Sequence, residues 1–199
     1  MKVSSLSPPL PYDGIRLRTM ADPTPRPPGQ TLLELRVAKV DLDAFAPLFQ
    51  RLTAAGIAFT TLRERQTADP QWLEEFTCLD NHTRSASGNP EVPRNVVAMR
   101  SRLTMLALDP AACFVARDGE RWIGYTVLDT AHSSTIRLHQ AWTGVLPAYQ
   151  QRGIGTALKV LGVGYARQNG YTFIDTALRT GNVASQALSR RLGFRPRTD

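Results

Sequence analysis

The segment Val145–Leu158, with the sequence VLPAYQQRGIGTAL, constrains the fold more than any other. An apolar run typical of a β-strand ends at Val145, a short turn follows, and two glycines open a helix. Apolar side chains then recur with helical spacing at positions 154, 158, 161 and 165. A strand that enters a long amphipathic helix through a glycine turn predicts a crossover connection, and therefore an α/β fold that is parallel where the helix crosses over.

The two glycines of this turn, Gly153 and Gly155, also predict a binding site. Glycine lets successive backbone N–H groups converge, and the N-terminus of a helix adds roughly half a positive charge. We therefore expect an anion cradle suited to a pyrophosphate, with Arg152 as an added cation. A Walker motif is excluded because Thr156 and Ala157 stand where it needs Lys and Ser or Thr, and a dinucleotide fingerprint is excluded because its third glycine is absent. The Gly-x-Gly pattern alone leaves open that these glycines serve only helix packing.

The remaining sequence predicts a mixed α/β sheet with flanking helices. Strands are expected at 31–37, 57–62, 112–116, 122–128, 135–145 and 171–176, with a short one from residue 194. Helices are expected at 42–56 after a cap at Asp41, from residue 70, and at 96–106, 154–169 and 182–192, while residues 81–94 are expected to form a polar loop.

This pattern divides the chain into three parts. Residues 1–30 hold seven of the fourteen prolines, which predicts a flexible, proline-rich tail. Met20 within it is a second candidate start of the natural chain, for which the intact mass of the native protein is the test. Residues 31–56 are expected to form a strand–helix leader, and residues 57–199 the main domain.

Charge and composition narrow the choice of partner. The net charge is +7, and residues 152–199 alone carry eight basic and two acidic side chains. A positive field confined to one segment favours a local anionic ligand over a uniformly basic, nucleic-acid-binding surface. Two cysteines and three scattered histidines provide no disulfide framework and no metal-ligand spacing, so no metal is expected. The sequence has no apolar run of roughly 18 residues and no signal-peptide core, which predicts a cytoplasmic protein without a membrane segment.

Two motifs in order resemble one known family. Gln150–Gly155 (QQRGIG) fits the Q/R-x-x-G-x-G/A motif of the GCN5-related N-acetyltransferase (GNAT) superfamily. About 30 residues on, the run 180–182 (TGN) and the run 190–194 (RRLGF) resemble the second signature of that family. The resemblance covers about residues 57–196, and the N-terminal half looks closest to members with tandem domains, although this chain has one full copy. It implies a mixed central sheet whose fourth and fifth strands splay apart, with acetyl-CoA as the cosubstrate and an amine of a small molecule or peptide as the acceptor.

The resemblance also implies roles for individual residues. The amide of Val145 would polarise the thioester carbonyl, and Gly144 would let the strand bulge at that point. Asn182 would contact the pantetheine or phosphate end of the cofactor. The complete set of residues expected to bind the cofactor is Val145, Gln150, Gln151, Arg152, Gly153, Ile154, Gly155, Thr156, Ala157 and Asn182.

Direct attack on a thioester requires a neutral amine, so a general base is expected. The candidates are His139 on the strand that leads to Val145, Glu64 and Asp80 on the substrate side, and Glu91 in the polar loop. A water chain is an alternative to each of them, and so is a purely structural role.

Two departures from the family pattern stand out. Many members have a tyrosine that protonates the departing thiolate, and here that position is Ser189. A serine hydroxyl is a much weaker acid, so the alternatives are departure without an acid, a role for Tyr149 or Tyr165, or loss of catalysis with ligand binding kept. The chain also ends soon after the second signature, so we expect the strand at 31–37, or a second subunit in a homodimer, to complete the sheet.

The sequence leaves three hypotheses about the function of this protein. The leading hypothesis is an acetyl-CoA-dependent N-acetyltransferase, and the alternative is a non-catalytic module that binds acyl-CoA. A nucleic-acid-binding protein is disfavoured because Phe194 is the one aromatic residue among the C-terminal arginines.

Overall fold

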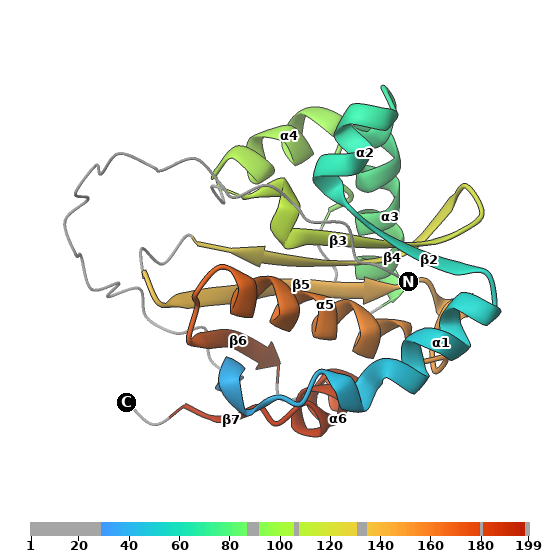
Figure 1. The fold of residues 1–199 in the computed structure, drawn as a ribbon. Helices are drawn as coiled ribbons and strands as arrows, with labels where there is room; N and C mark the ends of the chain where they lie inside the picture. Colours follow the sequence, from blue (N-terminus) through green and yellow to red (C-terminus); the bar gives the residue numbers. More distant parts are fainter. Residues whose placement is uncertain (1–28, 87–91, 106–107, 131–134, 180, 198–199) are drawn as a thin grey trace.

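A computed structural model describes residues 29–86, 92–105, 108–130, 135–179 and 181–197. Its centre is a seven-stranded sheet with the order β2-β3-β4-β5-β6-β1-β7 (Figure 1). The strands are β1 (Gln30–Arg36), β2 (Ile57–Thr61), β3 (Cys113–Asp118), β4 (Arg121–Asp129), β5 (Arg137–Val145), β6 (Phe173–Arg179) and β7 (Arg195–Pro196). Neighbouring strands are antiparallel except for β5 and β6, which are parallel because α5 crosses over between them.

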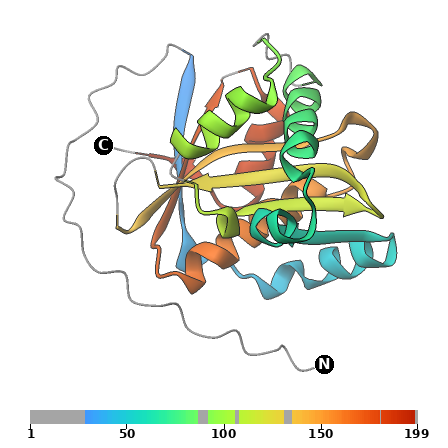
Figure 2. The ribbon, with the colours of Figure 1, turned by 90° about the horizontal axis from the view of Figure 1, so that it is seen from above.

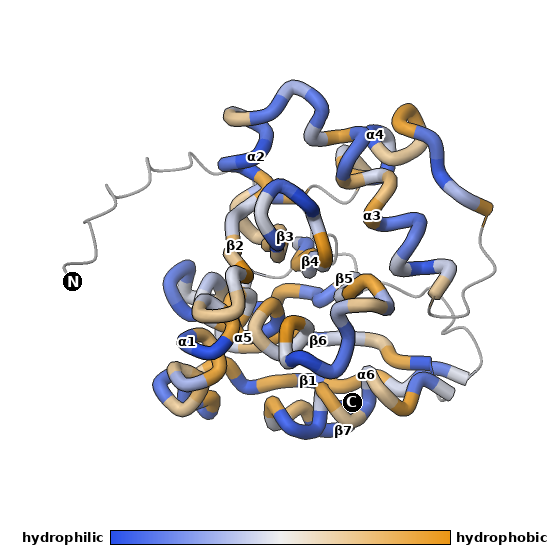
Figure 3. Tube along the Cα trace, turned by 90° about the vertical axis from the view of Figure 1, so that its right-hand side faces the viewer, coloured by the Kyte–Doolittle hydropathy of each residue, from blue (hydrophilic) through white to orange (hydrophobic). Residues whose placement is uncertain are grey.

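Helices cover both faces of the sheet. They are α1 (Ala46–Ala54), α2 (Leu62–Ala68), α3 (Trp72–Ala86), α4 (Val96–Met105), α5 (Ile154–Gln168) and α6 (Val183–Arg191). Helices α3 and α4 lie on one face, and α1 and α5 lie on the other (Figures 2 and 3). The apolar residues of β4 divide accordingly, because Tyr125 and Val127 pack with α3 and α4, while Ile123 and Leu128 pack on the α5 side. Ile123 packs on the opposite side from Tyr125, although the two are two residues apart, because the register of β3 and β4 shifts there and leaves Ile123 as an extra residue.

The strand expected at 31–37 is part of the sheet. Seven residues of β1 pair with β6, and β7 pairs with the other edge of β1 through Leu33 and Glu34. The prediction that this segment completes the sheet is confirmed, although β1 is an inner strand and β7 lies at the edge.

Three local predictions were wrong. Residues 81–86 continue α3 and do not form a loop, since Thr83 and Arg84 are buried by partners that their polarity did not reveal. Helix α2 was not expected, and a capping box between Thr61 and Glu64 starts it. Asp41 does not cap α1: its carboxylate accepts the amide of Asp43 at 3.1 Å, and a short 3-10 turn intervenes before Ala46.

The bulge expected at Gly144 lies elsewhere. The register of β4 and β5 shifts between Val127–Trp142 and Leu128–Gln140, which leaves Ala141 as the extra residue. Gly144 pairs regularly with Tyr125, and a Cβ at Gly144 would lie 2.6 Å from Thr83 Oγ1 on α3. Gly144 is therefore needed for the close approach of α3 to the sheet. The proline-rich tail lies outside the described residues.

Candidate functional site

The sheet opens between β5 and β6. These strands pair only where residues 137–139 face residues 173–175. Beyond that point β5 continues to Val145 and β6 continues to Arg179, but the two strands no longer pair with each other. Where the opening begins, the hydroxyl of Thr176 donates to the carbonyl of Gln140 at 3.1 Å. The predicted splay of the fourth and fifth strands of the domain is confirmed. It leaves backbone groups of β5 without a strand partner on that side.

Two amides of β5 point into this opening. The amide of Leu146 donates to Ile123 at 2.9 Å, and the register continues through Gly144 opposite Tyr125. Hydrogen-bonded and non-bonded pairs alternate along an antiparallel ladder, so Thr143 and Val145 turn their N–H groups away from β4. Val145 was expected at the site from the sequence. Thr143 was missed, because only the register shows that it shares this orientation.

The loop after β5 presents a row of unbonded amides. Gln151 has φ +61°, Gly153 has φ +90° and forms the N-cap of α5, and no side chain caps this helix. In the described part of the chain, the amides of residues 151–156 donate to no protein acceptor. Six N–H groups at a helix N-terminus fit a pyrophosphate, as the glycine pattern predicted.

The side chains of this loop have mainly structural partners. A Cβ on Gly153 would lie 2.6 Å from Leu48 Cδ1, so this glycine also lets α1 pack closely. Ile154 is buried, and so is Ala157, whose amide donates to the carbonyl of Gly153 at 3.0 Å and is not available to a ligand. Of the residues expected to bind the cofactor, Ala157 therefore does not fit this role.

Other expected cofactor residues are also held in place. The Gln150 side chain donates to the carbonyl of Val145 at 3.0 Å, which ties the loop to the end of β5. Arg152 donates to Ala148 at 2.9 Å and lies over the ring of Tyr149. Asn182 accepts the amide of Ser185 at 3.0 Å and caps α6. Gly155 has no side chain, and Thr156 is largely buried. The loop would therefore bind a ligand mainly through its backbone amides.

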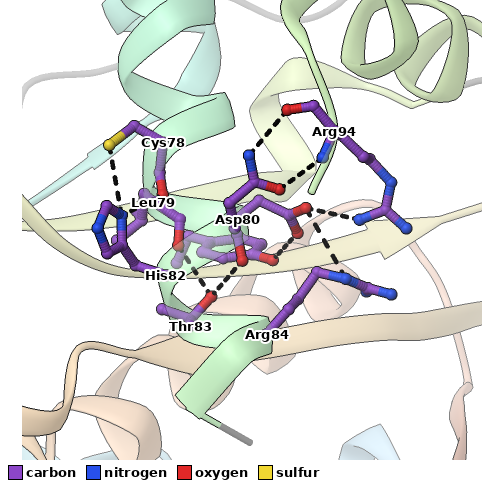
Figure 4. A network of polar contacts seen from close by, with 9 residues as sticks. Cys78, Leu79, Asp80, His82, Thr83, Arg84 and Arg94 are labelled. Carbon is purple, nitrogen blue, oxygen red and sulfur yellow. Dashed lines mark hydrogen bonds and ion pairs between the residues drawn. The ribbon is translucent and has the colours of Figure 1, made fainter. Parts of the chain in front are cut away.

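A buried polar network lies on the α3 side of the same strand. Asp80 is 4% exposed and accepts the hydroxyl of Tyr125, while its second oxygen accepts Arg94 at 2.7 Å (Figure 4). Arg84 lies 3.9 Å from that oxygen and stacks over Trp142 at 4.6 Å. Burial and the charge of Asp80 raise the pKa of Tyr125 well above its usual value, so its hydroxyl stays protonated.

A pocket opens beside this network. Its lining residues come from α3, α4, β4 and β5: Phe76, Asp80, Met99, Arg102, Leu103, Tyr125, Val127, Ala141 and Trp142. Tyr125 pairs with Gly144, which lies between the two residues whose amides face the strand opening. The pocket is therefore next to that opening, on the face of the sheet that α3 and α4 cover.

The candidate bases lie in different environments. His139 is partly buried, and its Nδ1 lies 3.5 Å from the buried carboxylate of Asp129. Glu64 is engaged as a cap: it accepts the hydroxyl of Thr60 at 2.6 Å and the amide of Thr61 at 2.7 Å, and these bonds lower its pKa. Glu64 lies on α2, just after β2 ends at Thr61, and that end of β2 is three strand spacings, or roughly 14 Å, from Thr143. Glu91 lies outside the described residues.

The candidate acids do not converge on the opening. Ser189 is fully buried, and its hydroxyl has no hydrogen-bond partner among the described residues. Tyr149 donates to Asp118 at 2.8 Å, and this bond raises its pKa. Tyr165 donates to Asp109 at 2.7 Å, and burial raises its pKa too. Both tyrosine hydroxyls are therefore held by carboxylate partners in this structure.

The described residues contain no cluster of three or more metal-ligating side chains. None of the described helices is long and apolar enough to span a membrane.

A sheet split between two parallel strands, with an amide cradle beside the split, is the architecture that the resemblance to the GNAT superfamily implied. The family model described as "Acetyltransferase (GNAT) family" matches residues 72–194. The chain belongs to this family.

Named relatives agree with this assignment. The chain is 29% identical over 182 residues to a mycothiol acetyltransferase of Clavibacter sepedonicus, covering 89% of this chain and 55% of the relative. It is 30% identical over 157 residues to a mycothiol acetyltransferase of Segniliparus rotundus, covering 76% and 56% respectively. The chain thus spans about half the length of these relatives. Among solved structures, a tandem GNAT protein from the clavulanic acid biosynthesis pathway superposes with a TM-score of 0.59 at 17% identity, covering 84% of this chain and 50% of that one.

Proposed function

We propose that this protein is an acetyl-CoA-dependent N-acetyltransferase that transfers acetyl directly from the CoA thioester to an amine of a small molecule or peptide. The observation that carries the proposal is the strand opening flanked by unbonded amides. Residues 151–156 would hold the pyrophosphate, and an extended arm would pair with the edge of β5 that β6 leaves without a strand partner. Family membership and the names of the relatives support the same reaction.

The backbone would supply the main catalytic interaction. The amine lone pair attacks the thioester carbonyl, and negative charge develops on its oxygen in the tetrahedral intermediate. An N–H of Thr143 or Val145, already directed into the opening, would donate to that oxygen. The C–S bond then breaks, the sulfur leaves as a thiolate, and the amine proton passes to a base.

His139 is the base that the structure favours. The buried carboxylate of Asp129 lies beside its Nδ1, where it would orient the ring and stabilise the imidazolium that forms when His139 takes up a proton. His139 is four residues before Thr143, a separation of up to about 13 Å along the strand. The bulge at Ala141 shortens this distance, and a chain of water molecules would relay the proton over the rest. Asp80 is closer to the opening, but its oxygens already accept Tyr125 and Arg94.

No dedicated acid is needed for this reaction near neutral pH. A cysteine thiol has a pKa of about 8.5, and a thiolate of this kind is a tolerable leaving group. The engaged tyrosines and the buried hydroxyl of Ser189 support departure without an acid. The same observations favour the alternative function, a non-catalytic module that binds acyl-CoA.

Release of CoA separates the two functions. The protein is mixed with acetyl-CoA and a panel of primary amines, including acceptors related to mycothiol, and free thiol is measured. Amine-dependent thiol release that falls in His139→Gln supports the enzyme. Thermal stabilisation by acetyl-CoA without thiol release supports the binding module, and neither response refutes both.

A cytoplasmic location and a homodimer also remain predictions. Cell fractionation and light scattering on the purified protein test them. A nucleic-acid partner would appear as binding that weakens steeply with salt.

A further inference from the structure

The pocket beside the strand opening contains more free hydrogen-bond donors than free acceptors. Asp80 is the carboxylate that lines it, and its two oxygens accept Tyr125 and Arg94. Arg84 lies close to the same carboxylate (Figure 4). Asp80 is therefore committed to neighbours in the protein and is not placed to bind a second cation from a substrate.

Arg84 and Arg94 lie against the carboxylate of Asp80, and Arg102 does not share this pairing. It lines the pocket from α4, and within the described residues its guanidinium has neither a hydrogen bond nor an ion pair. Burial lowers its pKa, and the neighbouring charges of Arg94 and Arg84 lower it further. A partly buried guanidinium without a counter-ion, close to two others, creates a positive potential in the pocket.

Trp142 supplies an independent observation. Its indole Nε1 is buried and has no acceptor among the described residues, although Trp142 lines the same pocket. Buried N–H groups without an acceptor are rare in folded proteins, and each calls for an explanation such as a ligand or water. Arg102 and Trp142, which both line the pocket, thus bring it one cation and one neutral N–H that have no acceptor among the described residues.

We propose that the amine acceptor carries a carboxylate and that Arg102 binds this group, with the Trp142 indole as a second donor. The inference rests on the proposed acetyl transfer, since it assigns the substrate class of the same site. The planar fork of an arginine matches a carboxylate in two parallel hydrogen bonds. Arg94 and Arg84 already lie against Asp80, so the guanidinium of Arg102 and one neutral N–H match a single negative charge better than a phosphate dianion.

The pocket also lies where such a group would be useful. Trp142 precedes Thr143 directly, and Tyr125 is paired with Gly144. A carboxylate held here fixes the acceptor next to the amides that face the strand opening. Arg102 is therefore a specificity-determining residue that orients the amine toward the thioester.

Matched acceptors test the proposal. Amino acids and dipeptides with a free carboxylate are each compared with the corresponding carboxamide, by CoA release under acetyl-CoA saturation. The carboxylates should give at least about a tenfold higher kcat/KM, the worth of one charged hydrogen-bonded pair. Arg102→Gln should remove this preference and Arg102→Lys should keep part of it. Arg100→Gln, exposed on the same helix, should leave it unchanged.

A binding measurement keeps the proposal independent of turnover. N-acetyl amino acids and their amides are titrated, and the quenching of tryptophan fluorescence is followed in the wild type and in Arg102→Gln. Tighter binding of the carboxylates, lost in Arg102→Gln, supports the site even if no acceptor releases CoA, in which case the proposed transferase activity fails. Equal turnover or binding of carboxylates and amides refutes the carboxylate site and leaves acetyl transfer intact. Preference for phosphorylated amines over carboxylates also overturns the assignment.

Discussion

Replacing Lys159 with methionine is expected to change how the free energy of unfolding depends on pH. Lys159 lies on α5 and is 3% exposed. Its Nζ donates to Gln140 Oε1 at 3.1 Å and lies 5.3 Å from the centre of the Phe194 ring. Burial lowers the pKa of this ammonium to about 8, and no acidic group among the described residues offsets the cost of burial.

The direction in which the free energy of unfolding changes with pH follows from proton linkage. In the unfolded chain the lysine returns to its ordinary value of 10.5, so the unfolded state binds the proton more tightly than the folded state. The destabilisation caused by burying the charged lysine is fully present below pH 8, and it is relieved as the pH rises from about 8 to 10.5. At about 1.4 kcal/mol per pH unit the full effect is about 3 kcal/mol, of which about 2 kcal/mol falls between pH 7 and pH 9.5.

Urea unfolding at several pH values between 7 and 9.5 measures this effect. The wild type should gain about 2 kcal/mol relative to Lys159→Met over that range. Lys39→Met changes an exposed lysine, and it should keep the pH dependence of the wild type. Parallel curves for wild type and Lys159→Met would show that the ammonium is not buried as described, and would refute the reasoning.

Three further variants test other parts of the structure. Ser189→Ala removes a buried hydroxyl without a partner, so it should change kcat less than twofold and leave stability equal or higher, by urea unfolding and CoA release. A large loss of turnover would restore Ser189 as an acid. Gly144→Ala places a Cβ 2.6 Å from Thr83 Oγ1, so it should cost about 1–3 kcal/mol of stability, and an unchanged midpoint of unfolding would contradict this packing. His139→Gln should lower kcat by at least about a hundredfold with little change in acetyl-CoA affinity, measured by calorimetry, whereas wild-type turnover would exclude it as the base.

The strand–turn–helix at 145–158 was predictable because its signals are local. Apolar periodicity and the glycines at 153 and 155 depend only on neighbours in sequence, and the structure has a strand to Val145 and a helix from Ile154. The positive φ at Gly153 follows for the same reason.

What the sequence did not reveal depends on contacts between distant segments. The extension of α3 through residues 81–86 relies on partners such as Arg94, whose amide donates to Asn81 Oδ1 at 2.9 Å. The role of Thr143 depends on the register of β5 against β4. The pocket of Arg102 and Trp142 forms only when α4 packs across the sheet beside α3. Tertiary packing, and not local propensity, decides each of these features.

The most direct test of the proposed site is an amide NMR titration of the wild-type protein with CoA. The largest shifts of backbone ¹H–¹⁵N resonances should fall on Gln151–Thr156 and on Thr143 and Val145, the groups that lack a protein acceptor or face the strand opening. The amide of Ala157, which donates within the helix, should shift less. Binding of CoA that leaves these resonances unmoved, or moves another surface, would contradict the assignment of the strand opening and its amide cradle as the cofactor site.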